Sequence, residues 1–390
     1  MEGGTQLFIL RLARGLIAQN VPVQVLLLEP SYENKTITSH FPEVTIIRRK
    51  NKTFKLSKKL DKLLFSLRSD YSFSEQTYKT WIRKFMEPGC IIHTNYIKTD
   101  HLIAQLKRKA PEFHHLVTVH GDYSAQYDHY KKFGRGIWNR MVNKMRLLKA
   151  QVDQWVVVSE EQRTFFLAEW QLPEQKIRKI YNGFEPLGKG MRLSLRNVKD
   201  ENLFIIGMVA RGVKEKGWNA LLKAFETLPD TARLILVGEG DYLTQLQQSN
   251  TNNRITFTGF HPDPVSIMEQ FDVLVLPTLF PFESLPSVIV EALYVGLPII
   301  ATRVGEIETM IQDAPSGKFA GFTIPYDGKS YDVALLSKYL RQLMMDKSMR
   351  QEMAVVAKRA FRKFNMGICI EKYRELYHRL SVPENVKSDL

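Results

Sequence analysis

Two glutamates with seven residues between them, Glu283 and Glu291, carry the strongest chemical signal in the sequence. They stand in FDVLVLPTLFPFESLPSVIVEALYVGLPIIAT, the segment from Phe271 to Thr302. Glu291 falls among valine, isoleucine, alanine and leucine, and a carboxylate in such an apolar helix costs free energy unless a polar partner compensates it. A ligand rich in hydroxyl groups would be such a partner. The plainer interpretation is that Glu291 faces solvent.

The loop that carries Glu283 leads into a helix, which the pattern predicts from Ser287 to Tyr294 with a proline in its first turn. The start of a helix leaves backbone N–H groups without partners, and these suit an anionic or hydroxylated ligand. The residues of this turn are Ser284, Leu285, Pro286 and Ser287.

Two cations follow the first apolar run of the second half of the chain. Arg211 and Lys216 lie five positions apart in Gly-x-x-Ala-Arg-Gly-x-x-Glu-Lys-Gly, the segment from Gly207 to Gly217. In a turn between a strand and a helix, such a pair can converge on a diphosphate, where the lysine supplies a point charge and the arginine a bidentate fork. Such charge would stabilise a diphosphate on which negative charge develops.

A histidine also ends a predicted strand in the first half, within Val117-Thr118-Val119-His120-Gly121. At the carboxyl end of a parallel strand, the imidazole of His120 can donate to a phosphate or to a sugar hydroxyl. His93 ends another predicted strand and is the weaker candidate, since a lone histidine is more often a structural residue.

The elements that must position these residues alternate along the whole chain. Short apolar runs, rich in β-branched residues, are each followed by a segment with helical period, which is typical of parallel α/β units. The predicted strands are Val23 to Leu28, Val44 to Ile47, Cys90 to His93, Leu116 to Val119, Trp155 to Val158, Ile177 to Ile180, Leu203 to Val209, Arg233 to Val237, Ile255 to Phe257, Val273 to Leu276, Ile299 to Ala301 and Phe322 to Ile324.

A chain of 390 residues is too long for a single ordinary core, so two domains are expected. A polar stretch from Pro186 to Asn202 interrupts the pattern and is interpreted as a linker. We therefore predict one Rossmann-like domain over residues 1–188 and a second over 189–366. A C-terminal helix in 367–390 should pack back on the first domain. Two doubly wound sheets would face each other across a ligand-binding crevice.

The beginning of the chain departs from this pattern. A doubly wound half normally opens with an apolar strand that feeds a glycine-rich turn, but Gly3 and Gly4 lead directly into a predicted helix, Thr5 to Ala18. We therefore expect this half to lack its usual first strand.

The composition restricts the compartment and the partners. Two cysteines, Cys90 and Cys369, argue against a disulfide framework and favour a reducing compartment. No apolar run is long enough to span a membrane, and no signal peptide is recognisable. We expect a cytoplasmic protein, on the inner face of the cell membrane if it contacts lipid. No cysteine cluster, Asp-x-Asp pair or His-Glu-x-x-His motif supports a metal site.

The net charge of +14 predicts attraction to polyanions, and the stretch from Arg48 to Arg68 concentrates it. There lysine and arginine alternate with leucine and phenylalanine, a pattern typical of helices that lie on anionic lipid. The equally good alternative is a solvated basic helix whose apolar residues face its own domain. No signature of nucleic-acid binding is present.

These motifs resemble those of the retaining GT-B glycosyltransferases of family 4, and the resemblance extends over nearly the whole chain. It rests on the spacing from Glu283 to Glu291, on Gly296-Leu297-Pro298 after it, and on Ala301-Thr302-x-x-Gly305. It implies that Glu283 lies against the donor sugar and that Glu291 binds the ribose hydroxyls.

The resemblance assigns further residues to the donor site. Arg211 and Lys216 match the pair that binds the pyrophosphate, and His120 matches a histidine near the sugar and the diphosphate. Gly3 and Gly4 are similar to a Gly-Gly loop whose N–H groups approach the donor phosphate. The loops with Gly238 and Phe260 resemble those that frame the nucleobase.

The expected activity is metal-independent transfer of a hexosyl unit from a nucleotide diphosphate sugar to a hydroxyl group, without a cofactor and with retention of configuration. The acceptor would be a glycan or a lipid-linked molecule, as in polysaccharide or lipopolysaccharide biosynthesis. Two alternatives stay open. One is another GT-B enzyme, such as a nucleotide-sugar epimerase or a sugar-phosphate-forming synthase. The other is a basic protein without enzymatic activity that binds membranes or nucleic acid.

Overall fold

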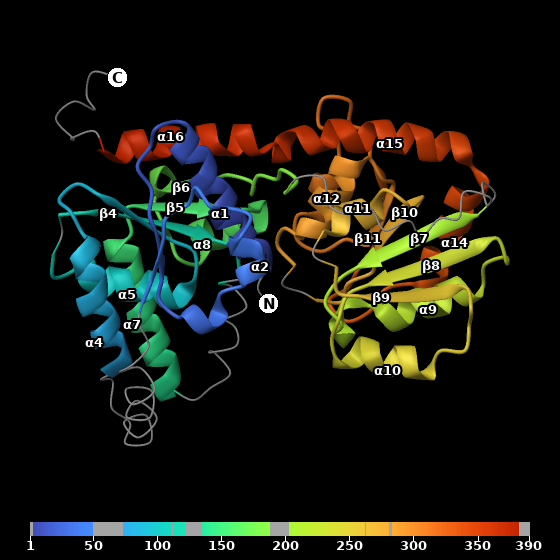
Figure 1. Cartoon of the computed structure of the whole chain (residues 1–390), viewed down its shortest axis with the longest axis horizontal. Coiled ribbons are helices and arrows are strands. Elements are labelled where there is room, and N and C mark those ends of the chain that lie inside the picture. The colour runs from blue at the N-terminus through green and yellow to red at the C-terminus, as the bar shows by residue number, and fades with distance from the viewer. Residues whose placement is uncertain are drawn as a thin grey trace. The chain divides into compact units, whose positions relative to one another are not determined.

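The computed structural model describes residues 3–49, 73–110, 112–121, 123, 135–187, 203–261, 263–280 and 283–381. The chain divides into two compact units (Figure 1). Unit 1 combines Met1–Gly183 with Met366–Leu390, and unit 2 is Phe184–Asn365. Each unit has its own core, as expected for a chain of this length.

Unit 1 contains two separate parallel sheets. Strands β3 to β6 form one sheet in sequence order, whereas β1 and β2 pair only with each other among the described strands. Among the described strands, the β1–β2 pair therefore shares no ladder with β3 to β6. The six strands are Val25–Leu27, Ile46–Arg48, Ile91–Thr94, His114–Val119, Gln154–Val157 and Ile177–Lys179.

Helices cover both faces of the larger sheet of unit 1. On one face, α1 (Gly3–Ala18) packs beside α16 (Met366–Ser381), and both contact Leu116 and Val156 (Figure 1). The neighbouring strand residues face the opposite side, because side chains alternate along a strand, and there Val117, Trp155 and Val157 pack in a second cluster. The other helices of four residues or more are α2 (Lys35–Thr38), α4 (Phe73–Ile82), α5 (Ile97–Lys107), α7 (Arg135–Gln151) and α8 (Glu160–Ala168).

Unit 2 is built around one six-stranded parallel sheet in the order β12-β11-β10-β7-β8-β9. Numbered from its first strand, this is the doubly wound order 6-5-4-1-2-3, in which the direction of winding reverses between β7 and β10. Ligands of such sheets bind at the carboxyl ends of the two strands that flank the reversal. The strands β7 to β12 are Phe204–Val209, Ala232–Val237, Ile255–Gly259, Val273–Leu276, Ile299–Thr302 and Gly321–Ile324.

The helices of unit 2 hold this sheet in place. Trp218 and Phe225 of α9 and Leu336 of α14 are fully buried against it. Both α14 and α15 begin at an aspartate, Asp332 or Asp346, whose side chain accepts from backbone N–H groups of the first turn. The helices are α9 (Trp218–Glu226), α10 (Asp241–Ser249), α11 (Pro264–Met268), α12 (Ser287–Val295), α13 (Ile307–Ile311), α14 (Val333–Met345) and α15 (Lys347–Phe361).

Candidate functional site

The loops after β7 and β10 bring Lys216 and Glu283 together in unit 2. Lys216 Nζ donates to Glu283 Oε2 in an ion pair, although 67 positions separate the two residues in sequence. Their side chains are only 9% and 13% exposed. The sequence placed both residues in the donor site, and the structure joins them directly at the reversal point of the sheet.

Local backbone geometry and an aromatic ring keep Lys216 in this position. The ammonium lies 5.3 Å from the centroid of the Phe280 ring, a favourable cation–π distance. Gly217 follows with φ +84°, and a Cβ atom there would lie 1.9 Å from the carbonyl oxygen of Pro277. Only glycine allows the lysine turn to approach the β10 loop so closely.

Thr278 connects the two loops that carry the ion pair. Its hydroxyl lies 3.3 Å from Glu283 Oε2 and 3.3 Å from the carbonyl oxygen of Glu215. The same carbonyl accepts from the backbone N–H of Leu279 at 2.7 Å. Thr302, the last residue of β11, donates its Oγ1 hydroxyl to the carbonyl of Thr278 at 2.6 Å. These hydrogen bonds connect the loops after β7 and β10 to the end of β11.

The loop after β11 closes over the backbone of the predicted donor turn. Gly305 has φ +53°, and a Cβ atom there would lie 1.9 Å from the carbonyl oxygen of Glu283. The N–H of Glu306 donates to the carbonyl of Ser284 at 3.1 Å. Ser284 and Leu285 are half-buried, Pro286 is buried, and Ser287 is exposed. The sequence predicted Pro286 in the first turn of this helix. In the structure it is the N-cap of α12 and so directly precedes the first turn.

Arg211 lies in the loop after β7, which hydrogen bonds fasten to its neighbours. Its carbonyl accepts from the indole N–H of Trp218 at 3.0 Å. The next residue, Gly212, donates its N–H to the carbonyl of Glu239 at 2.7 Å. The Arg211 side chain is exposed to solvent, whereas Lys216 is buried. One cation of the pair is thus preorganised, and the other is accessible to a ligand.

Gly238 and Phe260 directly follow β8 and β9. The N–H of Gly238 donates to the carbonyl of Gly259 at 2.9 Å, so the loops after β8 and β9 are neighbours. Phe260 is 61% exposed, unusual for so large an apolar side chain. Its ring is accessible for stacking on a planar group.

Glu291 lies in the second turn of α12 and is half-buried. Its helix neighbours Val290 and Ala292 are buried. The carboxylate is therefore on the boundary of the apolar face, rather than fully on the solvent side.

His120 directly follows β4 in unit 1 and has a defined tautomer. Its Nε2 lies 2.8 Å from Asn95 Oδ1, a pure acceptor, so Nε2 carries the proton. Its Nδ1 accepts from Asn182 Nδ2 at 3.2 Å, and the Phe8 ring packs edge-on with a centroid distance of 5.0 Å. Burial lowers the pKa of His120 to about 3, so the imidazole is neutral at pH 7.

His93 takes part in a different group of hydrogen bonds. Its ring nitrogens lie 2.8 Å from the Tyr377 hydroxyl and 2.7 Å from Thr118 Oγ1. Thr118 Oγ1 is also 2.8 Å from the hydroxyl of Tyr373, and burial lowers the pKa of His93 to about 3. His93 therefore binds α16 to the sheet, a structural role.

Other predicted features lie elsewhere or outside the described residues. Gly3 and Gly4 form the first turn of α1, where the sequence predicted a loop. Of the stretch from Arg48 to Arg68, only Arg48 and Arg49 are described. Within the described ranges, no group of three or more histidines, cysteines or carboxylates could hold a metal ion. In that same part of the chain, no helix combines the length and apolarity needed to cross a membrane.

Sequence reasoning missed Thr278, Asn95 and Asn182. Threonine and asparagine in loops usually stabilise turns, so their type alone indicates nothing about a site. The available signal was position, since Thr278 and Asn95 each follow a strand within two residues. In parallel sheets such positions face the ligand-binding edge.

Comparison with known proteins identifies the family. The model of Glycosyltransferase Family 4 matches residues 2–186, and that of Glycosyl transferases group 1 matches residues 193–360. The chain belongs to glycosyltransferase family 4. Its fold is the GT-B fold, with two Rossmann-like units.

Two solved structures share this fold over nearly the whole chain. Crystalline HepE of Anabaena, in complex with UDP and glucose, has a TM-score of 0.71 and 19% identity, and the match covers 97% of this chain and 96% of HepE. Sucrose-phosphate synthase from Thermosynechococcus elongatus has a TM-score of 0.69 and 20% identity, with 97% and 94% covered.

Sequence relatives match shorter regions. The sulfoquinovosyl transferase of Arabidopsis thaliana is 31% identical over 47% of this chain and 35% of its own length. The putative teichuronic acid biosynthesis glycosyltransferase TuaC of Bacillus subtilis is 25% identical over 60% of this chain and 57% of its own. The chain thus spans about a third to three-fifths of the length of these relatives.

Proposed function

We propose that this protein transfers a hexosyl unit from a nucleotide diphosphate sugar to a hydroxyl group of a glycan or lipid-linked acceptor. The transfer retains the anomeric configuration and needs no metal ion. The observation that carries this proposal is the Lys216–Glu283 ion pair, buried at the reversal point of a doubly wound sheet. A buried charge pair costs desolvation energy, which a ligand that uses the charge can offset.

In this proposal, Lys216 and Arg211 bind the diphosphate. Lys216 is fixed by Glu283 and Phe280, so its charge needs no reorganisation when the leaving group gains negative charge. Arg211 is exposed and can form the bidentate contact. This pair takes the place of a metal ion, and no further cofactor is required.

The remaining predicted residues orient the donor. The second oxygen of Glu283 positions the sugar hydroxyls, while Glu291 binds the ribose at the edge of α12. Phe260 offers its exposed ring to the base, next to the backbone at Gly238. The turn from Ser284 to Ser287 lies over the phosphate and sugar.

His120 acts as a neutral hydrogen-bond donor in this scheme. Its proton is on Nε2, and this N–H turns from Asn95 to a donor oxygen when the sugar binds. Gly3 and Gly4 contribute backbone N–H groups at the start of α1, where helix geometry leaves them without intrahelical partners. Front-face attack, in which the leaving phosphate takes the acceptor proton, accounts for retention without a protein nucleophile.

TuaC and the capsular polysaccharide glycosyltransferase CapM of Staphylococcus aureus are relatives that favour a polysaccharide pathway. We infer a cytoplasmic enzyme, peripheral at the inner face of the membrane through the basic stretch that starts at Arg48. Nucleic acid is not expected as a partner.

Slow hydrolysis of the nucleotide sugar, in which water replaces the acceptor, tests the proposal without knowledge of the acceptor. A thermal-shift screen of UDP, GDP, ADP and their sugars identifies the donor, since a specific ligand stabilises by mass action. Because HepE crystallised with UDP and glucose, UDP-glucose is the first candidate. Proton NMR should then detect free sugar that initially has the donor's anomeric configuration, at the same rate with and without EDTA.

Several results would redirect the proposal. An inverted sugar would exclude retention, and loss of activity in EDTA would exclude a metal-independent reaction. Conversion of the donor to an epimer would favour an epimerase. If no nucleotide sugar shifts the melting temperature, the enzymatic proposal loses its support, and co-sedimentation with anionic liposomes would then favour the nonenzymatic alternative.

A further inference from the structure

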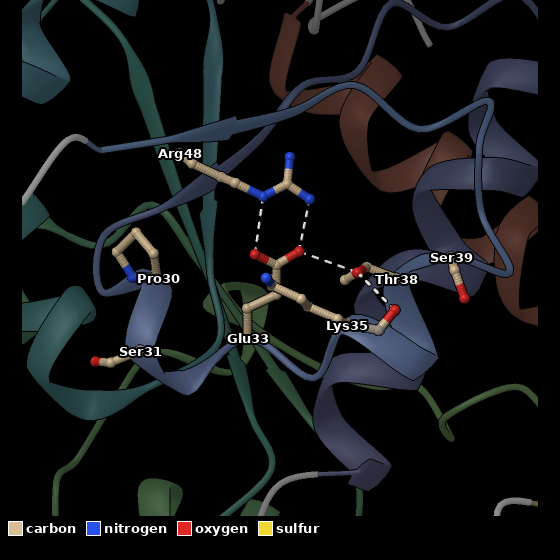
Figure 2. Close-up of a pocket in the computed structure, with 7 residues that line it drawn as sticks. All are labelled: Pro30, Ser31, Glu33, Lys35, Thr38, Ser39 and Arg48. Carbon is tan, nitrogen blue, oxygen red and sulfur yellow. Dashed lines mark hydrogen bonds and ion pairs between the residues drawn. The ribbon is translucent and has the colours of Figure 1, made fainter.

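An open pocket with charged and hydroxyl side chains in its wall lies at the carboxyl ends of β1 and β2 in unit 1. Its volume is about 680 Å³, within the range of small-ligand sites, about 300–1,000 Å³. Figure 2 shows its walls, with Pro30 and Ser31 on one side of the Glu33–Arg48 pair and Thr38 and Ser39 on the other. The complete lining is Pro30, Ser31, Glu33, Lys35, Thr38, Ser39 and Arg48.

The Glu33 carboxylate of this cavity already accepts three hydrogen bonds from protein groups. Arg48 donates from Nε to Glu33 Oε2 at 2.8 Å and from Nη2 to Oε1 at 2.5 Å. The Thr38 hydroxyl donates to Oε1 at 3.0 Å. These hydrogen bonds lower the pKa of Glu33, whose side chain is only 5% exposed. Glu33 therefore orients Arg48 and has little capacity left for a ligand.

The hydrogen-bond donors of the cavity, in contrast, exceed its acceptors. A guanidinium has five N–H groups, and Arg48 uses three of them, two on Glu33 and one on the carbonyl of Ile46 at 3.2 Å. Its side chain is 47% exposed. Lys35 and Ser31 are exposed and add further donors. Lys35 and Arg48 against Glu33 leave one net positive charge.

A donor-rich, positively charged cavity with hydroxyl groups around a fixed guanidinium matches one ligand chemistry. Carboxylates and phosphates bind the planar edge of arginine, and the hydroxyls of Ser31, Thr38 and Ser39 suit the ring hydroxyls of a sugar. We propose that this cavity binds the carboxylate or phosphate of an anionic sugar in the acceptor glycan. This inference rests on the proposed function only where it identifies the bound glycan as the acceptor. Binding of an anionic sugar to the cavity does not require sugar transfer.

Saturation-transfer NMR on the whole chain tests the inference with four probes: D-glucuronate, glucose 6-phosphate, D-glucose and inorganic phosphate. We expect at least one of the charged sugars to bind about tenfold more tightly than glucose and than inorganic phosphate. The two charged sugars separate a carboxylate site from a phosphate site. Equal binding of glucose, equal binding of inorganic phosphate, or no binding of either charged sugar would overturn the assignment.

Two charge-reversal variants test whether the charged sugar binds at this cavity. Lys35→Glu changes an exposed cavity residue outside the Glu33–Arg48 pair and should weaken binding of the charged sugar at least fivefold. Lys109→Glu makes the same change on an exposed residue between α5 and β4, outside the cavity lining, and should leave binding unchanged. Equal effects of the two variants would show general electrostatics and contradict the site.

Donor hydrolysis distinguishes failure of this inference from failure of the proposed function. Lys35→Glu should hydrolyse the nucleotide sugar at the wild-type rate, because none of the residues that line the cavity is assigned to the donor. If the wild type binds glucuronate but hydrolyses no donor, the cavity assignment survives and the proposed function fails.

Discussion

The two units differ in the polar groups that they bury beside the residues assigned to the donor site. Unit 2 buries a charged pair, Lys216 and Glu283, and surrounds it with the hydroxyl of Thr278 and the ring of Phe280. Unit 1 buries neutral imidazoles, among them His93, His115 and His120, which hydrogen-bond to hydroxyl and amide groups. A preorganised charge can stabilise a ligand on which charge develops during the reaction. Neutral hydrogen-bond donors can orient a ligand whose charge stays constant.

The largest expected effect follows from removal of the cation in unit 2. Lys216→Met should lower kcat about 10²–10³-fold, the usual cost of losing one preorganised electrostatic contact. It also leaves Glu283 unpaired in a largely buried position, which should reduce the unfolding free energy by about 3 kcal/mol. Steady-state kinetics and urea unfolding measure the two effects.

A second substitution separates catalysis from stability in this experiment. The double variant Lys216→Met with Glu283→Gln removes the uncompensated charge and should recover most of the lost stability, but none of the activity. A Lys216→Met protein with wild-type kcat would remove Lys216 from the mechanism.

Acid should weaken unit 1 more than unit 2. Burial lowers the pKa of His93, His115 and His120 to about 3, so below pH 6.5 the unfolded chain binds protons that the folded unit does not. Stability from each histidine is complete above pH 6.5 and is lost as the pH falls toward 3, by up to about 1.4 kcal/mol per pH unit. Asp100, whose pKa burial raises to about 6, acts in the opposite direction below pH 6 and offsets part of the loss.

Hydrogen exchange at pH 7.0 and 5.0, corrected for intrinsic rates, resolves this difference between the units. Protection of β4 and β5 should fall more than protection of β7 and β8. Replacing the fully buried His115 with glutamine should flatten the pH dependence of unit 1 by about one proton. Equal loss of protection in both units would contradict the contrast drawn between them.

The ribose contact should have a moderate effect. Glu291→Ala should raise the donor KM about tenfold, which corresponds to about 1.4 kcal/mol, with little change in melting temperature because Glu291 is only half-buried. Glu308→Ala, a carboxylate on the neighbouring helix α13, is a matched control and should keep the wild-type KM. Wild-type donor affinity in Glu291→Ala would refute the assignment.

The smallest predicted effect concerns the connecting residue Thr278. Thr278→Val keeps the shape of the side chain but removes its hydroxyl, at a net cost of about 1 kcal/mol per hydrogen bond. We expect a fewfold decrease in kcat with an unchanged donor KM, because the Glu283 carboxylate loses one of its orienting partners. Thr278→Ser retains the hydroxyl and should restore kcat. Failure of serine to restore it would leave only a packing role for Thr278.

Much of unit 2 followed from the sequence. The strand predicted at Val273 to Leu276 is β10 to the residue, and Ser287 begins α12 as expected. The hydrophobic periodicity of a segment and the residues that start and stop helices at its ends determine such elements. The contact between Lys216 and Glu283 did not follow, because it depends on β7 lying beside β10, and strand order is a property of the whole sheet.

Unit 1 was less predictable for the same physical reason. The sequence indicated all six strands, but it could not show that β1 and β2 pair apart from the others, since each residue pattern is compatible with either arrangement. His120 was recognised from its place after β4. Its partners Asn95 and Asn182 come from other parts of the chain, and the pairing fixes the tautomer in a way that residue type cannot indicate.

The central claim is that the charged loop of unit 2 holds the donor diphosphate, and calorimetric titration of nucleoside diphosphate tests it most directly. UDP, or the diphosphate chosen by the thermal-shift screen, should bind Lys216→Ala at least tenfold more weakly than the wild type. It should bind His120→Asn with nearly unchanged affinity. Wild-type affinity in Lys216→Ala, with binding lost in His120→Asn, would contradict the account.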